Sequence, residues 1–266
     1  MGKVAMLIDT SKCTGCRGCQ VACKEWNDLP ATTTTNWGSY ENPPDLSAST
    51  WTRISFHEVA DDRGVRWLFF KEGCLHCTEA ACVEVCPTAA LQYHEMGFVS
   101  LDEDRCNGCG YCVEFCPFQI PRLEINPLTG QGKAYKCTLC QDRVTNDLIP
   151  ACAKTCPANA IQFGDREAMV TMAQKRVEEL KAIGYTNAVV YGDKELGGLG
   201  RIYVLMERPS VYGLPENPQV PALTRLWQKG IQPFGYAAVG LTLLGLGFNW
   251  VVQRRVARAA EAEEEG

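Results

Sequence analysis

Short apolar runs alternate with polar stretches containing glycine or proline along most of the chain. Three of these runs, 4–8, 67–70 and 98–101, come shortly before a group of cysteines. Runs of this length bounded by turn residues are typical of short buried strands. Two further runs, 188–191 and 201–205, flank the sequence GGLG, which we interpret as a turn and not as a phosphate-binding loop. The pattern predicts small strands, several of which end at cysteine loops.

Residues 165–183 have the period of one amphipathic helix. Asp165 is a candidate N-cap, and Gly184 follows the last predicted turn. The apolar stripe consists of Met169, Ala173, Val177 and Leu180. We expect this stripe to pack against the core, not to bind a cofactor.

The C-terminal region has a different pattern. Residues 230–253 contain no charged side chain, and 234–252 are almost entirely apolar, which is long enough to cross a bilayer. Basic residues flank the run at Arg225, Lys229, Arg254, Arg255 and Arg258, and Trp227, Tyr236 and Trp250 stand where interfacial aromatic residues are common. Gly235, Gly240, Gly245 and Gly247 give it small surfaces for packing against other membrane helices. We expect a single transmembrane helix; the alternative is a buried helix of a soluble domain.

Composition narrows the class of protein. The chain has 266 residues, of which 46% are hydrophobic and 21% charged, as in a folded globular protein. Its net charge of −5 argues against a nucleic-acid partner, because a protein that binds phosphates normally has a basic excess. No GxSxG, HExxH or P-loop motif indicates a catalytic centre.

The sixteen cysteines form four groups of four with none left over. The groups are Cys13, Cys16, Cys19 and Cys23; Cys74, Cys77, Cys82 and Cys86; Cys106, Cys109, Cys112 and Cys116; and Cys137, Cys140, Cys152 and Cys156. Groups one and three have the spacing C-x2-C-x2-C-x3-C of bacterial ferredoxins, which bind [4Fe–4S] clusters. Proline follows the last cysteine of every group except the first, where Lys24 stands.

Zinc and disulfides are the alternatives to iron. Group four alone has a spacing that would suit zinc, but three thiols at x2 spacing crowd one tetrahedral ion in groups one and three. A disulfide scaffold is disfavoured because no secretory signal precedes the first motif; the apolar run 4–8 is too short for one. The spacing therefore favours four [4Fe–4S] clusters.

An internal repeat suggests how the groups pair. The sequence CPTAALQY at 86–93 resembles CPANAIQF at 156–163. Groups two and three are close in sequence and should form one two-cluster module, while groups one and four form another. With the ligand exchange of such modules, the predicted ligand sets are Cys13/Cys16/Cys19/Cys156, Cys137/Cys140/Cys152/Cys23, Cys74/Cys77/Cys82/Cys116 and Cys106/Cys109/Cys112/Cys86.

We therefore predict an α+β protein with two bacterial ferredoxin-like modules and one C-terminal transmembrane helix. The predicted domains are an outer module at 1–23 and 117–164, an insertion or docking loop at 24–73, an inner module at 74–116, a helix and hairpin extension at 165–229, a transmembrane helix at 230–253 and a charged tail at 254–266. Four clusters in a row indicate electron transfer between distant sites.

Basic residues and histidines near the cysteines are further candidates. Lys12, Arg17, Lys24, Arg105, Lys136 and Lys154 flank the ligands, where cations would raise a cluster's potential or simply be solvated. Lys136 is singled out because it directly precedes Cys137. His76 lies between two ligands and could donate to a cluster sulfur or simply pack beside it, whereas His57 and His94 read as ordinary loop or strand residues.

Several motifs resemble the beta subunit of respiratory formate dehydrogenases, in the molybdopterin oxidoreductase family. They are KCTGCRGCQVACKEWND (12–28), ENPPDLSAS (41–49), RCNGCGYCVEFCPFQIPR (105–122) and YKCTLCQDRV (135–144). The resemblance covers nearly the whole chain. Nitrate reductase relatives replace one cysteine of group three by Trp, but Cys109 is present here, which implies a full [4Fe–4S] cluster.

The resemblance implies a non-catalytic electron-transfer subunit with two protein partners. These are a catalytic alpha subunit carrying molybdenum or tungsten on a pterin, and a cytochrome b gamma subunit that reduces quinone at the membrane. It also implies an electron path from the Cys13 cluster through the Cys137 and Cys74 clusters to the Cys106 cluster. The alternatives are the equivalent subunit of polysulfide or dimethyl sulfoxide reductase and a zinc-scaffold interaction protein.

Charge bias around the apolar run suggests an orientation in the inner membrane. Three basic residues follow the run and two precede it, which predicts a cytoplasmic C-terminus and a periplasmic cluster domain. A folded metalloprotein without its own signal would need a partner for export, and the alpha subunit of the family carries a twin-arginine signal.

Overall fold

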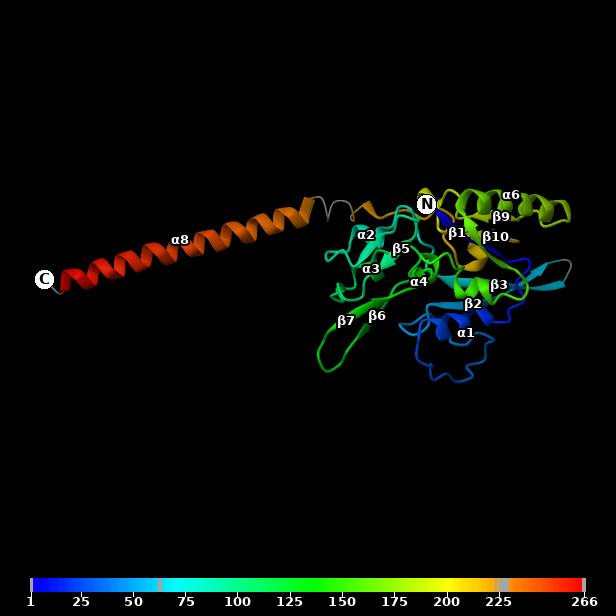
Figure 1. Cartoon of the computed structure of the whole chain (residues 1–266), viewed down its shortest axis with the longest axis horizontal. Helices are drawn as coiled ribbons and strands as arrows, with labels where there is room; N and C mark the ends of the chain where they lie inside the picture. Colours follow the sequence, from blue (N-terminus) through cyan, green and yellow to red (C-terminus); the bar gives the residue numbers. More distant parts are fainter. Residues whose placement is uncertain (1, 62–63, 223, 225–229, 265–266) are drawn as a thin grey trace. The chain divides into compact units, whose positions relative to one another are not determined.

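A computed structural model describes residues 2–61, 64–222, 224 and 230–264. The chain divides into two compact units, Met1–Val220 and Pro221–Gly266. The first unit contains all the cysteines and the second contains one long helix (Figure 1). Each unit is described by itself.

A four-stranded sheet with the order β8-β1-β10-β9 supports one side of the first unit (Figure 1). Its strands are β1 (Val4–Asp9), β8 (Ile161–Asp165), β9 (Val189–Tyr191) and β10 (Arg201–Leu205). β1 pairs parallel with β10 and antiparallel with β8, so the start of the chain lies between two segments from its second half. β9 and β10 pair antiparallel, which confirms the two short strands predicted around GGLG.

Helix α6 (Arg166–Ala182) covers one face of this sheet. Asp165 caps it by accepting backbone hydrogen bonds from Glu167 and Ala168 at 3.0 and 3.1 Å. The predicted stripe is buried in a cluster formed by Ala5, Leu7, Met169, Ala173, Val177, Leu180, Ala188, Ile202 and Val204. The amphipathic helix is thus confirmed, and its stripe belongs to the core.

The side chains on the opposite face of β1 pack in the buried cluster that contains cysteines. Met6 and Ile8 alternate with Ala5 and Leu7 along the strand, and neighbouring strand residues point to opposite faces. Met6 and Ile8 belong to the same buried cluster as two cysteines, Cys19 and Cys152. One strand therefore connects the apolar core under α6 with the first cysteine loops.

The rest of the first unit consists of short elements around cysteine loops. Two small hairpins are formed by β4 (Leu91–Tyr93) with β5 (Val99–Leu101) and by β6 (Arg122–Ile125) with β7 (Gly132–Tyr135). The helices next to cysteines are α1 (Gly18–Trp26), α2 (Ala81–Glu84), α3 (Tyr111–Glu114), α4 (Gln141–Val144) and α5 (Ala151–Lys154), and two single 3-10 turns follow at η1 (Glu195–Gly197) and η2 (Pro209–Tyr212). These brief elements hold the loops in place without a large core of their own.

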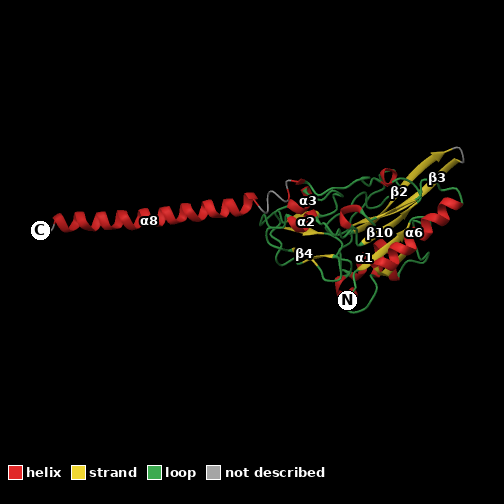
Figure 2. Cartoon of the chain, turned by 90° about the horizontal axis from the view of Figure 1, so that it is seen from above, coloured by secondary structure: helices red, strands yellow, loops and turns green. Residues whose placement is uncertain are grey.

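The segment predicted as a long loop is partly regular. Its second half forms a hairpin of two ten-residue strands, β2 (Thr52–Asp61) and β3 (Gly64–Gly73), which lie side by side in Figure 2. Only the run 67–70 of this hairpin was expected. The apolar positions Ile54 and Phe56 of β2 alternate with polar ones, and this period of two is the signal that the loop interpretation overlooked.

The second unit contains helix α8 (Gln232–Glu264). Its segment Gln232–Arg255 has 24 residues and a mean hydropathy of 1.5, so by length and composition it could cross a membrane; it is the one such helix among the described residues. Tyr236 and Trp250 are exposed on it. The prediction of a membrane span also used three residues before the helix that lie outside the described residues: Arg225, Trp227 and Lys229.

Candidate metal centres

All sixteen cysteines are free thiols, and their positions can be compared with the four predicted ligand sets. We name the sets site I (Cys13, Cys16, Cys19, Cys156), site II (Cys23, Cys137, Cys140, Cys152), site III (Cys74, Cys77, Cys82, Cys116) and site IV (Cys86, Cys106, Cys109, Cys112). Sites I, II and IV each line a separate cavity, and each of these cavities contains the cysteine from the distant group. The structure therefore brings together the cysteines that the internal repeat paired.

Sites I and II share helix α1. Cys16 lies just before the helix, Cys19 on its first turn and Cys23 near its end, so one helix spans from one site to the next. Site I is completed by Cys156, which follows α5, and site II by Cys152 on α5. Because α1 and α5 pack through Cys19 and Cys152 in one buried cluster, the two sites lie side by side.

Sites III and IV repeat this arrangement with shorter helices. Cys82 lies on α2 and Cys112 on α3, and the two are members of one buried cluster. At site III, burial and the neighbouring thiols Cys74, Cys82 and Cys116 raise the pKa of Cys77. Cys116, from the third group, is therefore close to cysteines of the second group.

The loops present backbone N–H groups to the sulfurs. Leu139 N–H donates to Cys137 Sγ at 3.4 Å, and Ala134 N–H donates to Cys106 Sγ at 3.3 Å. Gly108 has a φ of +70°, and a Cβ there would overlap the backbone of Gly132, so this loop needs glycine to close against β7. Loops of this kind, with N–H groups turned inward, are suited to anionic groups such as iron–sulfur clusters.

Burial makes the isolated thiols poor acids. It raises the pKa of Cys19 to about 11 and, with the neighbouring thiols, the pKa of Cys112 and of Cys140 to about 12. Crowded thiolates in a buried environment are stable only when positive charge lies close. A bound metal ion provides this charge and takes the place of the thiol protons. Cavities lined by four free thiols, with N–H donors at Cys106 and Cys137, have the chemistry that suits iron–sulfur clusters.

Three buried cations surround site II. The side chains of Lys71, Lys136 and Arg201 belong to residues that are 2%, 3% and 0% exposed. Lys136 donates to the backbone oxygens of Val99 and Cys137 at 2.7 and 3.1 Å. Sequence reasoning singled out Lys136 but missed Lys71 and Arg201, which are distant in sequence from the cysteines of site II. The available signal was a single basic residue in each of two apolar runs, WLFFKEGC and RIYVL.

The other flanking basic residues have partners away from the sulfurs. Lys12 pairs with Asp9 at 3.7 Å and Arg105 with Asp102 at 3.3 Å. Lys24 donates to Ser49 O at 2.6 Å, and Arg17 lies over the Phe56 ring at 5.0 Å. These contacts hold loops in place. Lys154 is exposed at the end of α5.

The three histidines differ in environment. His76 is fully buried, and its Nδ1 accepts the N–H of Val99 at 3.3 Å. Burial, with Lys136 and Arg201 nearby, lowers its pKa, and among the described residues its Nε2 has no hydrogen-bond partner. His94 stacks on Phe98, and His57 lies on β2 beside Ser55, with 3.0 Å between Nε2 and Oγ.

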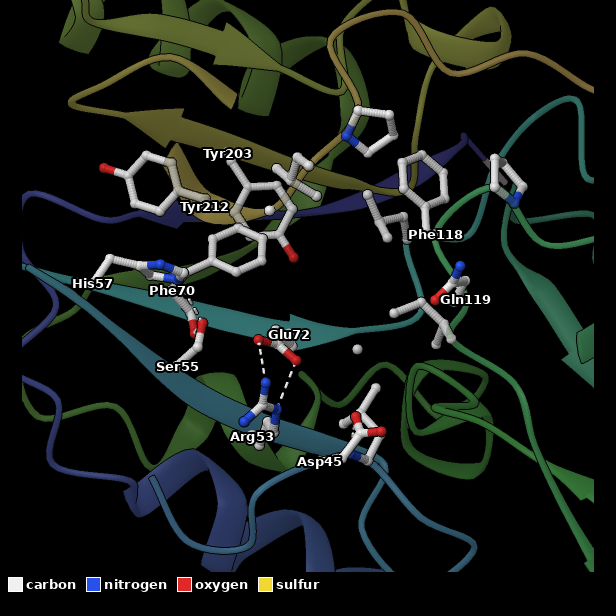
Figure 3. A pocket seen from close by; sticks show the side chains of 18 of the residues that line it. Asp45, Arg53, Ser55, His57, Phe70, Glu72, Phe118, Gln119, Tyr203 and Tyr212 are labelled. Atoms are coloured by element: carbon white, nitrogen blue, oxygen red, sulfur yellow. Dashed lines mark hydrogen bonds and ion pairs between the residues drawn. The ribbon is translucent and has the colours of Figure 1, made fainter. Parts of the chain in front are cut away.

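A separate pocket of about 780 Å³ lies over the β2–β3 hairpin, and no cysteine lines it (Figure 3). Arg53 on β2 donates to its cross-strand neighbour Glu72 on β3 at 2.7 and 2.8 Å and to Glu41 at 2.8 Å. One arginine is therefore shared by two carboxylates in this pocket. Residues 117–120, which follow the last cysteine of site III, form part of its wall.

Comparison with known proteins identifies the family of the chain. Residues 12–90 and 65–166 each match a family of 4Fe–4S dicluster domains. The formate dehydrogenase-O iron–sulfur subunit of Escherichia coli K12 is 45% identical over 254 residues, which cover 94% of this chain and 83% of the relative. The nitrate-inducible formate dehydrogenase iron–sulfur subunit of the same strain is 43% identical over 253 residues, 94% and 85% of the two chains.

A shorter relative matches less of the chain. The beta subunit of formate dehydrogenase 2 (cytochrome c-553) from Nitratidesulfovibrio vulgaris is 41% identical over 186 residues, 66% of this chain and 83% of the relative. The fold and the matched domains define the protein as an iron–sulfur protein of the 4Fe–4S dicluster class. More narrowly, the chain belongs to the family of formate dehydrogenase iron–sulfur subunits.

Proposed function

We propose that this chain is the electron-transfer subunit of a formate dehydrogenase and carries four [4Fe–4S] clusters, one at each of sites I to IV. The observation that carries the proposal is that twelve of the sixteen cysteines line three cavities, each with cysteines from two sequence groups, while Cys116 of the third group acts on Cys77 of the second. Each bound cluster would accept and pass on one electron. The protein supplies the ligands, the N–H donors and the spacing between sites.

The contacts between sites support a linear order I–II–III–IV. Sites I and II touch through Cys19 and Cys152. Cys74 of site III packs in one buried cluster with Cys23 and Cys137 of site II. The thiols of Cys82 and Cys112 bring sites III and IV together.

Exposure supports the same order. Cys16 of site I and Cys109 of site IV are the exposed cysteines of the chain, whereas all four cysteines of site II are buried. Electrons that pass between proteins need clusters near the surface at both ends. Sites I and IV therefore fit the two points of exchange, and sites II and III the interior of the path.

The family supports two partners for these ends. We infer that site I faces a catalytic alpha subunit with a molybdenum or tungsten pterin, and that site IV faces a cytochrome b subunit that reduces quinone. The relatives are named as subunits of formate dehydrogenases, which supports formate as the electron source. No reacting group for formate is assigned to this chain.

The long helix supports attachment to a membrane. Segment Gln232–Arg255 is apolar along a length that matches a bilayer, and Arg254 and Arg255 end it. We propose that it is a single anchor in the inner membrane, with the C-terminus in the cytoplasm and the clusters in the periplasm. The arginines after the span support this orientation.

Metal analysis of the full chain, purified without oxygen, tests the function. Four clusters predict about 16 irons per chain and as many sulfides, a brown colour, and signals of reduced clusters in electron paramagnetic resonance (EPR) after dithionite. Stoichiometric zinc in a colourless preparation would contradict electron transfer. In the complete complex, formate should reduce quinone, and a chain without iron should not support this reaction.

A further inference from the structure

Arg201 is the most buried of the three cations around site II, and it touches a predicted ligand. Its Nη2 donates to Cys137 Sγ at 3.5 Å, and the residue is 0% exposed. The side chain comes from β10, whereas Cys137 follows β7. Two distant segments therefore meet at one sulfur.

The fold leaves room for this guanidinium at a particular point. Gly73, at the end of β3, has a φ of +146°, and a Cβ there would lie 2.7 Å from Nη1 of Arg201. The same Cβ would lie 2.9 Å from the backbone oxygen of Trp51. Glycine at this position lets the arginine pack flat between the hairpin and site II.

The charge of Arg201 is not balanced by a carboxylate. Among the described residues, no ion pair includes Arg201, Lys71 or Lys136. Burying unpaired cations costs several kcal/mol each unless an anion lies close. The groups that interact with Arg201 are the Tyr203 hydroxyl and the sulfurs of Cys137 and Cys152, and of these the site II sulfurs would carry negative charge when a cluster is bound.

Cys137 receives donors from two sides. Nη2 of Arg201 lies 3.5 Å from Cys137 Sγ, and the N–H of Leu139 donates to the same sulfur at 3.4 Å. Lys71 acts also on Cys13 and Cys19, and Lys136 on Cys82, so both lysines are shared between sites. Both thiols that interact with Arg201, Cys137 and Cys152, belong to site II, although Arg201 also acts on His76.

We propose that Arg201 sets the reduction potential of the cluster at site II, holding it high enough for an electron to enter a fully buried site. This rests on the proposed function. An electron arriving from the neighbouring cluster at site I or III adds one negative charge at site II, and burial disfavours that charge. The guanidinium stabilises the reduced form, and no proton needs to follow because arginine remains charged. Arg201 is thus a tuning residue and not a ligand.

An EPR-monitored redox titration of the full chain with its clusters tests this. In Arg201→Gln, one of four reduction steps should move to lower potential. At a fixed potential the ratio of oxidised to reduced cluster should rise by about tenfold or more, which corresponds to about 59 mV for one electron. Arg201→Lys keeps the positive charge and should bring the potential of that step most of the way back to its original value. Loss of packing alone would not explain such a recovery.

Arg105→Gln is the matched control. Arg105 also stands next to a predicted ligand, Cys106, but its side chain is 57% exposed and paired with Asp102. Water screens such a charge, so all four steps should stay in place. An equal shift in the Arg105 variant, or an unmoved set of steps in an iron-replete Arg201→Gln protein, would overturn the proposal.

A measurement on the unmutated protein covers the case in which the variants do not fold. Arginine labelled with 15N in its guanidinium should give a hyperfine coupling to one reduced cluster, and that cluster should be the one whose step moves in Arg201→Gln. Absence of the coupling while all four clusters are present would overturn the role of Arg201 alone. Absence of iron would instead overturn the proposed function.

Discussion

The region around sites I and II and the region around sites III and IV hold cysteines in the same way but are stabilised differently. Sites I and II lie against a four-stranded sheet that α6 covers on its other face. Sites III and IV are surrounded by strands of three or four residues, and two of the six buried residues in their core cluster, Cys82 and Cys112, are cysteines. We therefore expect the second region to depend more than the first on what its cysteines bind.

Removal of iron should give the largest difference in stability between the two regions. When a chelator strips the clusters, hydrogen exchange in β4 and β5 should become faster by about 100-fold or more, because these hairpin strands lose their main source of order. β1 and β10 should keep most of their protection, since apolar packing under α6 remains. Mass spectrometry of exchanged peptides measures this, and equal loss in both regions would contradict the comparison.

Substitution of one candidate ligand in each region gives a matched pair of variants. Cys109→Ser and Cys16→Ser both alter an exposed cysteine, and each should cost about four of the 16 irons expected per chain. Only Cys109→Ser should also loosen the strands next to its site, because site IV lacks a sheet behind it. Iron assay and hydrogen exchange on the same samples compare the two; greater unfolding in Cys16→Ser would reverse our interpretation.

A cavity under α6 should act on the first region alone. Leu180→Ala removes a buried side chain of the α6 stripe and should lower the free energy of unfolding by about 2–5 kcal/mol, with iron content unchanged. Met172→Ala on the exposed side of the same helix is the control, with an effect below about 0.5 kcal/mol. Urea titration followed by helix circular dichroism measures both, and loss of iron in Leu180→Ala would mean that the sites depend on this core.

Loss of the helix cap should give the smallest effect. Asp165→Ala leaves the N–H groups of Glu167 and Ala168 without their acceptor and should destabilise by about 1 kcal/mol. Asp165→Asn keeps an acceptor oxygen and should recover most of this loss. The same urea titration applies, and an Asp165→Ala variant as stable as the unmutated chain would show that the cap contributes nothing.

Elements with a strong local signal were predicted well. The helix at 165–183, the strands around GGLG and the apolar C-terminal run each depend on a short stretch whose period or length is sufficient. β2 was overlooked because its alternation stood inside a segment rich in polar residues and turns. Its order comes from pairing with β3, a contact that local propensity does not include.

For the candidate sites, too, features within a short stretch of sequence were predicted and features that depend on distant segments were not. Cysteine spacing indicated which chemistry the chain could hold, and the repeat at 86–93 and 156–163 suggested which groups exchange ligands. Lys71 and Arg201 escaped notice since each stands in an apolar strand far along the chain from Cys137. Only packing of β3 and β10 against site II makes them neighbours of its sulfurs.

The sequence by itself determined the candidate ligands and their grouping into loops, because thiols a few residues apart are held near one another by the covalent chain. It also determined the apolar length of α8. The tertiary structure decided which sites touch, which cysteines are exposed and which cations share the interior with sulfur. These properties depend on contacts between distant segments, where burial weakens the screening of charge by water and a single guanidinium acts strongly on its neighbour.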